Sequence, residues 1–340
     1  MKLFLRTFVI LAVVGVVVTT LLYIQFYGNA VRGEVVIRLG ARELAEGEAA
    51  RLIDSLVKPN IRHKFAFDTY ASRLNLLDRV KPGNYELKKG MDVVDIVRML
   101  KLGEQSSVKL VFNYARGVEF LAATISKQID ADSLSLVEAM RSDSLATEFG
   151  LSSAQLVSLF IPNTYSVWWT ISPEELVRRM NVESNRFWNE SRESARKAMK
   201  LSRVEVMTLA SIVFEETRKV DEMPRIAGVY LNRLRKRMKL QADPTVKFAL
   251  GDFTIRRVLY KHLEYDSPYN TYKYRGLPPS PIATPSIAAI DSVLGAEKHN
   301  YIYFCARPEM DGYHNFAATY TQHKINARAF AAELNKRGVK

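Results

Sequence analysis

The feature that most constrains this chain is an uncharged stretch near its N-terminus. From Thr7 to Val31 no residue carries a charge, and residues 8–24 are apolar apart from one glycine and two threonines. A helix of about 20 apolar residues, rising about 1.5 Å per residue, crosses a hydrocarbon core of about 30 Å and satisfies its own backbone groups there. The sequence therefore predicts one membrane-spanning helix.

The flanking charges predict the orientation of that helix. Lys2 and Arg6 precede it, and the first acid after it is Glu34. Excess positive charge stays on the cytoplasmic side, so we expect a cytoplasmic N-terminus, a single pass through the cell (inner) membrane and an extracytoplasmic remainder. A cleaved signal peptide is the alternative, because Gly28-Asn29-Ala30 has the small residues of a cleavage site. The apolar run is longer than the usual signal-peptide core, which favours the uncleaved anchor.

Composition limits the remaining function classes. Of 340 residues, 48% are hydrophobic and 25% charged, which is typical of folded domains rather than disorder. The net charge of +13 favours an anionic partner, and an extracytoplasmic location argues against nucleic acid. The single cysteine, Cys305, cannot form an internal disulfide; its apolar neighbours predict a buried, unreactive side chain.

Hydrophobic periodicity and turn signals predict an α+β fold. Residues 35–39 have the pattern of a strand and residues 46–57 that of a helix. A turn at Pro82-Gly83 leads into a strand over 84–87, and a helix over 91–102 ends at Gly103. This small unit has no cluster of catalytic residue types, so we interpret it as a binding or positioning module.

Helices and long loops dominate the predicted second part. We expect a strand over 108–112 and helices over 121–129, 134–140, 172–191 and 203–220, with a further helix from Pro224. Ser172 with Glu175, and Ser202 with Glu205, form capping boxes. Eight of the twelve prolines lie between Pro224 and Pro308, and loops on a folded scaffold often carry sites. The predicted organisation is an anchor over 1–32, a module over 33–105 and a catalytic domain over 106–340.

Glu216 is the candidate acid–base group. In a helix it shares a face with Leu209, Ile212 and Val213, whereas Glu215 follows a more polar line. A carboxyl group beside apolar surface has a raised pKa, as a general acid for glycoside cleavage near neutral pH requires. The alternative is a structural ion pair between Glu216 and Arg218 or Arg225.

One carboxylate suffices for glycan cleavage if the substrate supplies the nucleophile. The 6-hydroxyl of N-acetylmuramic acid (MurNAc) can attack its own anomeric carbon, while one glutamate protonates the leaving oxygen and accepts the hydroxyl proton. A second acid, Asp243, precedes Pro244 and could equally be a helix cap.

Other patterns admit both functional and structural interpretations. The loop residues 269–272 and 276–279 have the aromatic and amide composition of a sugar cleft, or could pack as loops. The basic run 233–239 fits a solvated helix end, or contact with an anionic polymer. His314 and His323 lack further ligands at zinc spacing, and no phosphate loop, G-x-S-x-G or H-E-x-x-H motif occurs, so no metal or cofactor is expected.

Seven ordered motifs resemble the YceG-like family of endolytic murein transglycosylases. They are Leu209-Ala210-Ser211-Ile212-Val213 with Glu216-Thr217, Val229-Tyr230-Leu231-Asn232-Arg233-Leu234, residues 238–246 (MKLQADPTV), Tyr269-Asn270-Thr271-Tyr272, Gly276-Leu277-Pro278-Pro279, Ile282-Ala283-Thr284-Pro285 and Tyr301-Ile302-Tyr303-Phe304. Residues 81–103 are similar to the family's LysM-like module, and residues 160–165 resemble its F-P-D-T-Y stretch. Two departures are Phe214, where the family usually has a second glutamate, and Asn163, where it has aspartate.

The resemblance implies a function and a site. It implies a membrane-anchored lytic transglycosylase that cleaves the β-1,4 bond between MurNAc and N-acetylglucosamine (GlcNAc) within peptidoglycan strands and leaves 1,6-anhydroMurNAc ends. It implies catalysis by Glu216, with Glu215 as the alternative register. Penicillin-binding synthases are implied partners. The substrate-binding residues expected are Ser211, Asn232, Gln241, Asp243, Thr245, Tyr269, Asn270, Thr271 and Tyr272. A muramidase-type hydrolase and a non-catalytic glycan-binding scaffold remain alternatives.

Overall fold

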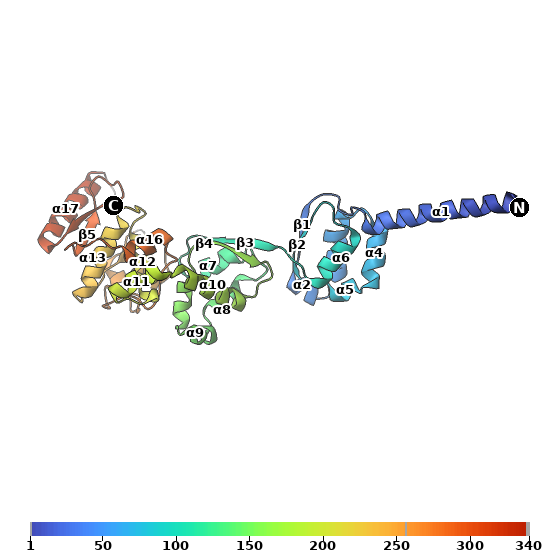
Figure 1. Ribbon diagram of the computed structural model, residues 1–340. Helices are drawn as coiled ribbons and strands as arrows, with labels where there is room; N and C mark the ends of the chain where they lie inside the picture. Colours follow the sequence, from blue (N-terminus) through green and yellow to red (C-terminus); the bar gives the residue numbers. More distant parts are fainter. Residues whose placement is uncertain (1, 256, 338–340) are drawn as a thin grey trace. The chain divides into compact units, whose positions relative to one another are not determined.

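The protein is described by a computed structural model that covers residues 2–255 and 257–337. It has a mixed α/β fold with an apolar N-terminal helix (Figure 1). Two compact units share the chain. Unit 1 comprises Met1–Leu110, Lys127–Ala131 and Tyr165–Ile171, and unit 2 comprises Val111–Ser126, Asp132–Thr164 and Ser172–Lys340. We describe each unit by itself.

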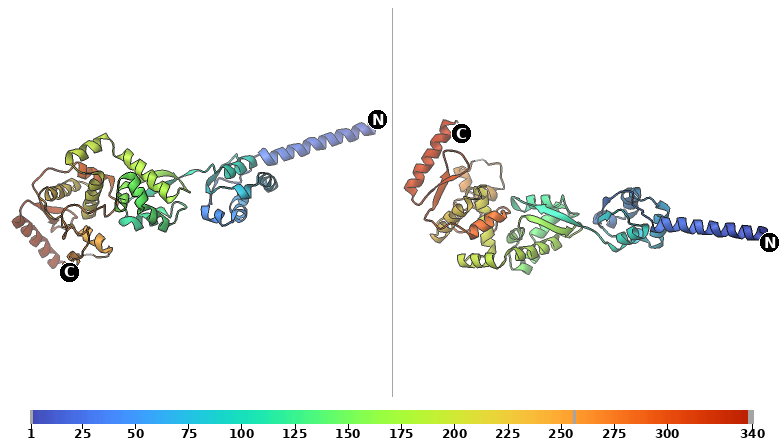
Figure 2. Two further views of the ribbon diagram at one scale, coloured as in Figure 1. Left: turned by 90° about the horizontal axis from the view of Figure 1, so that it is seen from below. Right: turned by 45° about the horizontal axis from the view of Figure 1, so that its top comes forward.

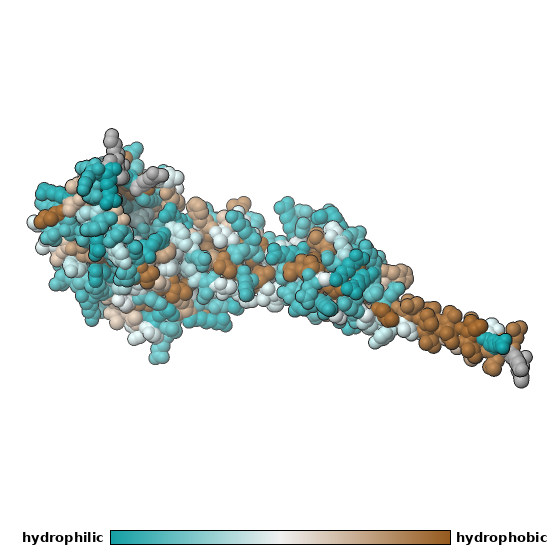
Figure 3. All heavy atoms as spheres, turned by 90° about the horizontal axis from the view of Figure 1, so that it is seen from above, coloured by the Kyte–Doolittle hydropathy of each residue, from teal (hydrophilic) through white to brown (hydrophobic). Residues whose placement is uncertain are grey.

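Unit 1 begins with the long apolar helix α1, Lys2–Tyr27. The most apolar 18-residue window within residues 3–27 has a mean hydropathy of 2.6, so this helix is long and apolar enough to cross a membrane. Figure 3 shows a hydrophobic surface along this helix. The hydroxyls of Thr19 and Thr20 donate to the carbonyl of Val16, so the polar atoms inside the apolar run have partners within the helix.

The rest of unit 1 packs helices against a two-stranded sheet. β1, Val35–Leu39, pairs antiparallel with β2, Gly83–Leu87. α6, Val93–Leu102, follows a capping box made by Asp92 and ends at Gly103, whose φ of 77° favours glycine. The strand and cap predictions are confirmed here. The remaining elements are α2 Ala41–Ala45, α3 Ala49–Leu52, the π-helix η1 Ile53–Val57, the 3₁₀ turn η2 Lys58–Asn60, α4 Lys64–Arg73 and α5 Leu76–Arg79.

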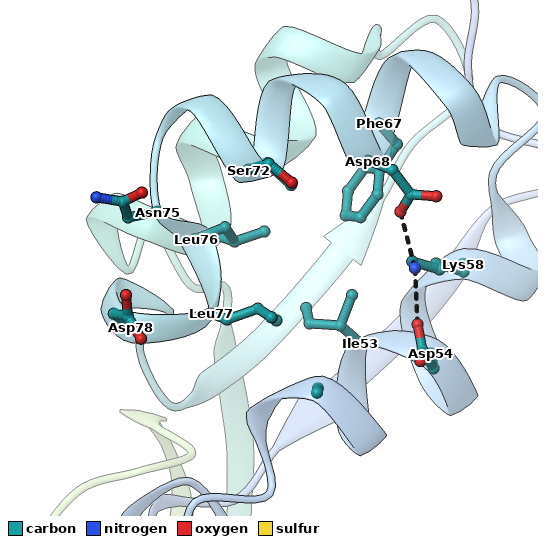
Figure 4. A pocket seen from close by; sticks show the side chains of 12 residues that line it. Ile53, Asp54, Lys58, Phe67, Asp68, Ser72, Asn75, Leu76, Leu77 and Asp78 are labelled. Carbon is teal, nitrogen blue, oxygen red and sulfur yellow. Dashed lines mark ion pairs between the residues drawn. The ribbon is translucent and has the colours of Figure 1, made fainter.

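The helix predicted over 46–57 is confirmed only from Ala49 onward, and it is not α-helical throughout. The α-helical part covers four residues, and a π-helix follows before the 3₁₀ turn that contains Pro59. Ile53 and Val57 of the π-helix are both buried, so core packing decides the local geometry here. This segment borders a cavity of about 450 Å³. Figure 4 shows Lys58 between Asp54 and Asp68 at its edge, with Nζ–O distances of 2.8 and 2.7 Å.

Unit 2 is mainly helical. Its helices before the site are α7 Gly117–Ile125, α8 Ser133–Met140, α9 Asp143–Phe149, the 3₁₀ helix η3 Ser153–Leu159, α10 Pro173–Phe187 and α11 Glu190–Met199. Then come α12 Arg203–Glu216, α13 Met223–Arg235, α14 Asp243–Leu250, α15 Tyr260–Leu263, α16 Ile287–Leu294 and α17 Tyr320–Lys336. β5 Tyr303–Ala306 and β6 His314–Ala317 pair antiparallel beside α17 (Figure 2). β3 Ser107–Phe112 pairs with β4 Asn163–Trp168, and the division between the units runs within both strands.

Both predicted capping boxes in unit 2 are confirmed, but the helices they open end earlier than predicted. α10 ends at Phe187 because Trp188 is buried outside the helix and Asn189 caps a new helix. α12 ends at Glu216 because Thr217 is extended, with φ −145°.

α12 is the central helix of unit 2. Its residues 206–213 are all buried, and it packs against α13, α14 and α16. A helix that is apolar on every face belongs in a core. Glu216 is therefore the last residue of a rigid, enclosed helix.

Candidate active site

Glu216 lies at one wall of a cavity of about 250 Å³. The side chains around it come from α12, α13, the start of α14, the loop before α16 and the β5–β6 sheet. The lining residues are Glu216, Tyr230, Arg233, Leu240, Gln241, Asp243, Tyr272, Phe304, Cys305, Ala306 and His314. Segments almost 100 residues apart in the sequence thus meet around one carboxyl group.

Protein surrounds Glu216 on most sides, and the cavity leaves part of it accessible. Removal of hydration raises the pKa of Glu216 to about 7, although the hydroxyl of Tyr230 lowers it by donating to Oε1 at 2.6 Å. The nearby charge of Asp243 raises the pKa further. A raised pKa, which the apolar helix face predicts, is confirmed.

Tyr230 is completely enclosed, and burial raises the pKa of its phenol well above the usual value. The phenol therefore keeps its proton and acts as a donor to Glu216. Phe304 packs edge-on against Tyr230 and against His314, with centroid distances of 5.8 and 5.2 Å. These rings form the apolar side of the cavity.

Glu215, the neighbouring acid, has a different environment. Its side chain is 9% exposed and forms ion pairs with Arg116 at 3.1 Å and Arg218 at 3.2 Å. The hydroxyl of Tyr114 also donates to it. The structural ion pair proposed as the alternative for Glu216 belongs to Glu215, because Arg218 pairs with Glu215 and Arg225 with Glu297. Within the described residues, no cation forms an ion pair with Glu216.

Asp243 brings a second carboxylate to the same cavity. It occupies the first turn of α14, but its side chain makes no cap hydrogen bond, so the capping interpretation is wrong. Instead, the hydroxyl of Tyr272 donates to Asp243 Oδ1 at 2.5 Å, and burial beside that carboxylate raises the pKa of Tyr272. Gln241, with φ 53°, lies in the left-handed region, a strained conformation common at functional sites.

His314 faces the cavity from β6 and is held by a buried acid. Glu222, 4% exposed, accepts from the backbone N–H of His314 at 2.8 Å and contacts its Nδ1 at 2.7 Å. A carboxylate on Nδ1 fixes the orientation of the imidazole ring. The cavity therefore contains two acids and one positioned histidine.

Arg233 corrects the interpretation of the basic run. Its side chain is buried rather than solvated, and it donates to the carbonyls of Ile302 at 2.6 Å and Leu240 at 2.8 Å. It thereby ties α13 to β5 and to the Gln241 loop. The residues at 235–237 and Lys239 are exposed, as a solvated helix end predicts. Cys305 is half-buried and lines the cavity, so the prediction of a buried core cysteine is also wrong; partial burial raises its pKa.

Three of the nine predicted substrate-binding residues line the cavity: Gln241, Asp243 and Tyr272. The other six lie behind it and make structural hydrogen bonds. Ser211 accepts from the backbone N–H of Ile282, and Asn232 donates to the carbonyls of His299 and Tyr301. Thr245 and Thr271 bond to each other and to Ala242.

The last two of the six hold the loop that carries Tyr272. Asn270 donates to the carbonyls of Leu263 and Tyr265 and accepts from the N–H of Tyr272. Tyr269 bonds to Ser280 and packs against Phe248. In this arrangement the six residues hold the segments that form the cavity wall, and their side chains do not line the cavity.

Comparison with known proteins places this architecture in a family. The profile of the YceG-like family matches residues 43–329, most of the chain. The chain belongs to the YceG-like family.

Individual relatives agree with this assignment. A Bacillus subtilis (strain 168) protein named endolytic murein transglycosylase is 28% identical over 312 residues, which covers 86% of this chain and 85% of the relative. A Streptococcus pneumoniae (strain D39) protein of the same name is 28% identical over 276 residues, 72% of this chain and 50% of that protein. The crystal structure of a YceG-like protein from Listeria monocytogenes matches with a TM-score of 0.56 and 26% identity, covering 86% of this chain and 98% of that one.

The two departures from the family pattern lie outside the cavity of this YceG-like chain. Phe214 packs against Tyr114 at a centroid distance of 5.6 Å and under the guanidinium of Arg218 at 3.9 Å. It belongs to the surroundings of Glu215 rather than to those of Glu216. Asn163 is exposed, and its side chain accepts from the N–H of Thr164.

Sequence reasoning did not select four residues of the site: Tyr230, Arg233, Phe304 and His314. No periodicity connects them to Glu216, because they lie on other elements. For Tyr230 a signal was present, since a tyrosine inside an ordered motif at the centre of a helix is a plausible hydrogen-bond donor. For Arg233, the apolar residues Ile226, Val229 and Tyr230, seven, four and three positions earlier, placed it on the buried stripe of α13, and the charge run that follows concealed this.

Proposed function

We propose that this YceG-like protein is a membrane-anchored lytic transglycosylase. In this proposal it cleaves the MurNAc–GlcNAc β-1,4 bond within peptidoglycan strands and leaves 1,6-anhydroMurNAc ends during cell-wall assembly. The coarser assignment, an endolytic murein transglycosylase and hence a lyase, follows the names of its relatives. The observation that carries the finer proposal is Glu216, an acid with a pKa of about 7 at the wall of a cavity, which forms no ion pair with a cation of the described residues.

Glu216 has the properties of a group that both gives and accepts a proton. At a pKa of about 7, comparable amounts of acid and carboxylate are present near neutral pH. The acid protonates the glycosidic oxygen as the bond to C1 breaks. The resulting carboxylate accepts the proton of the MurNAc 6-hydroxyl as its oxygen bonds to C1, so no water is consumed. Tyr230, bonded to Oε1, leaves Oε2 as the oxygen for this exchange.

Asp243 completes the electrostatics of the proposed site. An oxocarbenium-like centre develops positive charge at C1, which an ionised Asp243 at the same cavity stabilises. The hydrogen bond from Tyr272 fixes the position of that carboxylate.

Asp243 also keeps a muramidase-type hydrolase as the second candidate. A glycosidase that activates water uses two carboxyl groups, and two of them line this cavity. The products distinguish the two candidates: anhydro ends indicate transglycosylation, and reducing ends indicate hydrolysis.

In this proposal the N-terminal part of the chain places the catalytic domain at the membrane and near the glycan. α1 anchors the chain in the cell membrane with the N-terminus cytoplasmic, and residues 33–105 form a LysM-like glycan-positioning module. The catalytic domain, residues 106–340, then acts on peptidoglycan outside the cytoplasm, where penicillin-binding synthases are candidate partners. A reporter fused to residue 340 should be active only on the extracytoplasmic side.

Mass spectrometry of products from purified glycan strands tests the function. The parent should release fragments with 1,6-anhydroMurNAc ends, and Glu216→Gln, a near-isosteric change, should release almost none. Reducing ends from the parent would establish the hydrolase instead. Equal digestion by the parent and Glu216→Gln would leave the catalytic assignment without support and favour a glycan-binding scaffold.

A further inference from the structure

A second, larger hollow lies beside the catalytic cavity. It has a volume of about 640 Å³ and shares Arg233, Gln241, Tyr272 and Phe304 with the cavity that contains Glu216. We call it the aromatic groove. Its other walls come from β5, α17 and the segment 257–263. The catalytic cavity, about 250 Å³, is below the range of about 300–1,000 Å³ that is usual for ligand sites, so a chain of bulky sugars must extend beyond it.

The groove is lined by rings at van der Waals distances from one another. Tyr303 stacks on His323 with a centroid distance of 5.1 Å and an interplanar angle of 16°, and Tyr320 lies 5.8 Å from Tyr303. Tyr320 is 59% exposed and Tyr260 is 88% exposed, which is unusual for rings of this size. Aromatic faces carry partial negative charge and attract the polarised C–H groups of a sugar face.

The charge of the groove differs from that of the catalytic cavity. Arg233 and Arg257 line the groove, and among the described residues no carboxylate does, whereas Glu216 and Asp243 line the cavity. His323 adds a buried Nδ1 atom without a hydrogen-bond partner. The groove therefore suits a sugar that carries both hydrogen-bonding groups and a carboxylate.

We propose that the aromatic groove is a second saccharide subsite, which stacks an N-acetylhexosamine of the same strand on Tyr320 while Arg257 faces the lactyl carboxylate of a strand without stem peptides. This deepens the proposed function, because it rests on a glycan strand passing Glu216. Binding energy from this remote sugar holds the strand in place and does not take part in the chemistry. Its loss therefore weakens substrate binding more than turnover.

Binding to an inactive parent tests the subsite without relying on the reaction. In full-length Glu216→Gln, titration with amidase-treated glycan strands gives a reference Kd. Adding Tyr320→Ala should weaken binding about five- to tenfold, the size of one lost aromatic contact. Adding Tyr320→Phe should leave Kd within about twofold, because the ring is retained. Tyr265→Ala, an exposed tyrosine outside the groove, is the matched control and should have no effect.

The active enzyme gives an independent readout. Tyr320→Ala should raise KM for strands about five- to tenfold with kcat within about twofold, and Arg257→Met should remove part of the salt dependence of KM. Unchanged binding in Tyr320→Ala, an equal loss in Tyr265→Ala, or a fall in kcat alone would overturn the subsite. If the parent produced reducing ends, the transglycosylase proposal would fail while the binding contrast between Tyr320→Ala and Tyr320→Phe stayed valid.

Discussion

Two cavities of this protein, one in each unit, have carboxylates with different partners. At the cavity of unit 1, Asp54 and Asp68 are 64% and 52% exposed and share Lys58 between them (Figure 4). At the cavity of unit 2, Glu216 has a phenol as its partner and no cation among the described residues. The first two acids therefore keep contact with water and with an ammonium group. Desolvation without a cation keeps the third near half-protonation.

Glu215 shows that enclosure alone does not produce this difference. Its side chain is only 9% exposed, yet two arginines and a tyrosine bond to its carboxyl group. Adjacent residues on one helix thus have different chemistry, because the partners on other elements differ. Pairing, rather than burial, separates the structural acid from the candidate catalytic acid.

The largest expected effect on the reaction rate comes from replacing each of the two neighbouring glutamates by glutamine, one at a time. Glu216→Gln should lower kcat about 10²–10⁴-fold, the usual contribution of a general acid–base group. Glu215→Gln, the matched change one residue away, should retain kcat within about tenfold but unfold more easily, because two arginines lose their carboxylate. Steady-state rates and urea unfolding of both full-length variants measure this. A folded, inactive Glu215→Gln beside an active Glu216→Gln would move the site to Glu215.

A second prediction concerns stability against pH. The folded-state pKa of Glu216 is raised from 4.5 to about 7, so the folded protein holds this proton more tightly than the unfolded chain does. Stability therefore falls as pH rises through that window. Glu216→Gln should remove this fall and be more stable than the parent by on the order of 2 kcal/mol above pH ~7.5. Urea unfolding at several pH values checks it, and parallel pH curves for the two proteins would contradict it.

Tyr230→Phe should have an intermediate effect. The tyrosine hydroxyl lowers the pKa of Glu216, so its removal should shift the alkaline limb of the pH–rate profile upward and reduce kcat roughly tenfold. Tyr85→Phe is the control. Tyr85 is equally buried in unit 1 and donates to the carbonyl of Lys81, so its loss should affect stability without moving the profile. A profile that moves in both variants would show that the shift is not specific to the site.

The smallest effect is expected in unit 1. Lys58→Met removes both ion pairs at the first cavity, but the two acids remain hydrated, so stability should change by no more than about 1 kcal/mol. The rate of strand cleavage should stay the same. Thermal unfolding and initial rates measure this, and a tenfold lower rate would mean that the cavity of unit 1 contributes to turnover.

The sequence predicted local structure well where the signals were local. The capping boxes at Ser172 and Ser202, the glycine cap at Gly103 and the apolar helix α1 each depend on neighbours a few residues apart. Predictions failed where the deciding contact was distant. The second half of the helix predicted over 46–57 is a π-helix whose buried residues pack in the core, and Asp243 bonds to a tyrosine 29 residues away instead of capping its helix.

What the sequence by itself determined is the list of parts: an apolar span, helices with their caps, and an acid on the apolar face of a helix. Only the tertiary structure decided which acid is unpaired. Arg116 and Tyr114 approach Glu215 from about 100 residues away, while Tyr230 and Phe304 approach Glu216. The pKa of a carboxyl group depends on the water it loses and the charges it meets. Both the loss of water and the nearby charges depend on contacts between different helices and strands, so the periodicity of one helix cannot predict them.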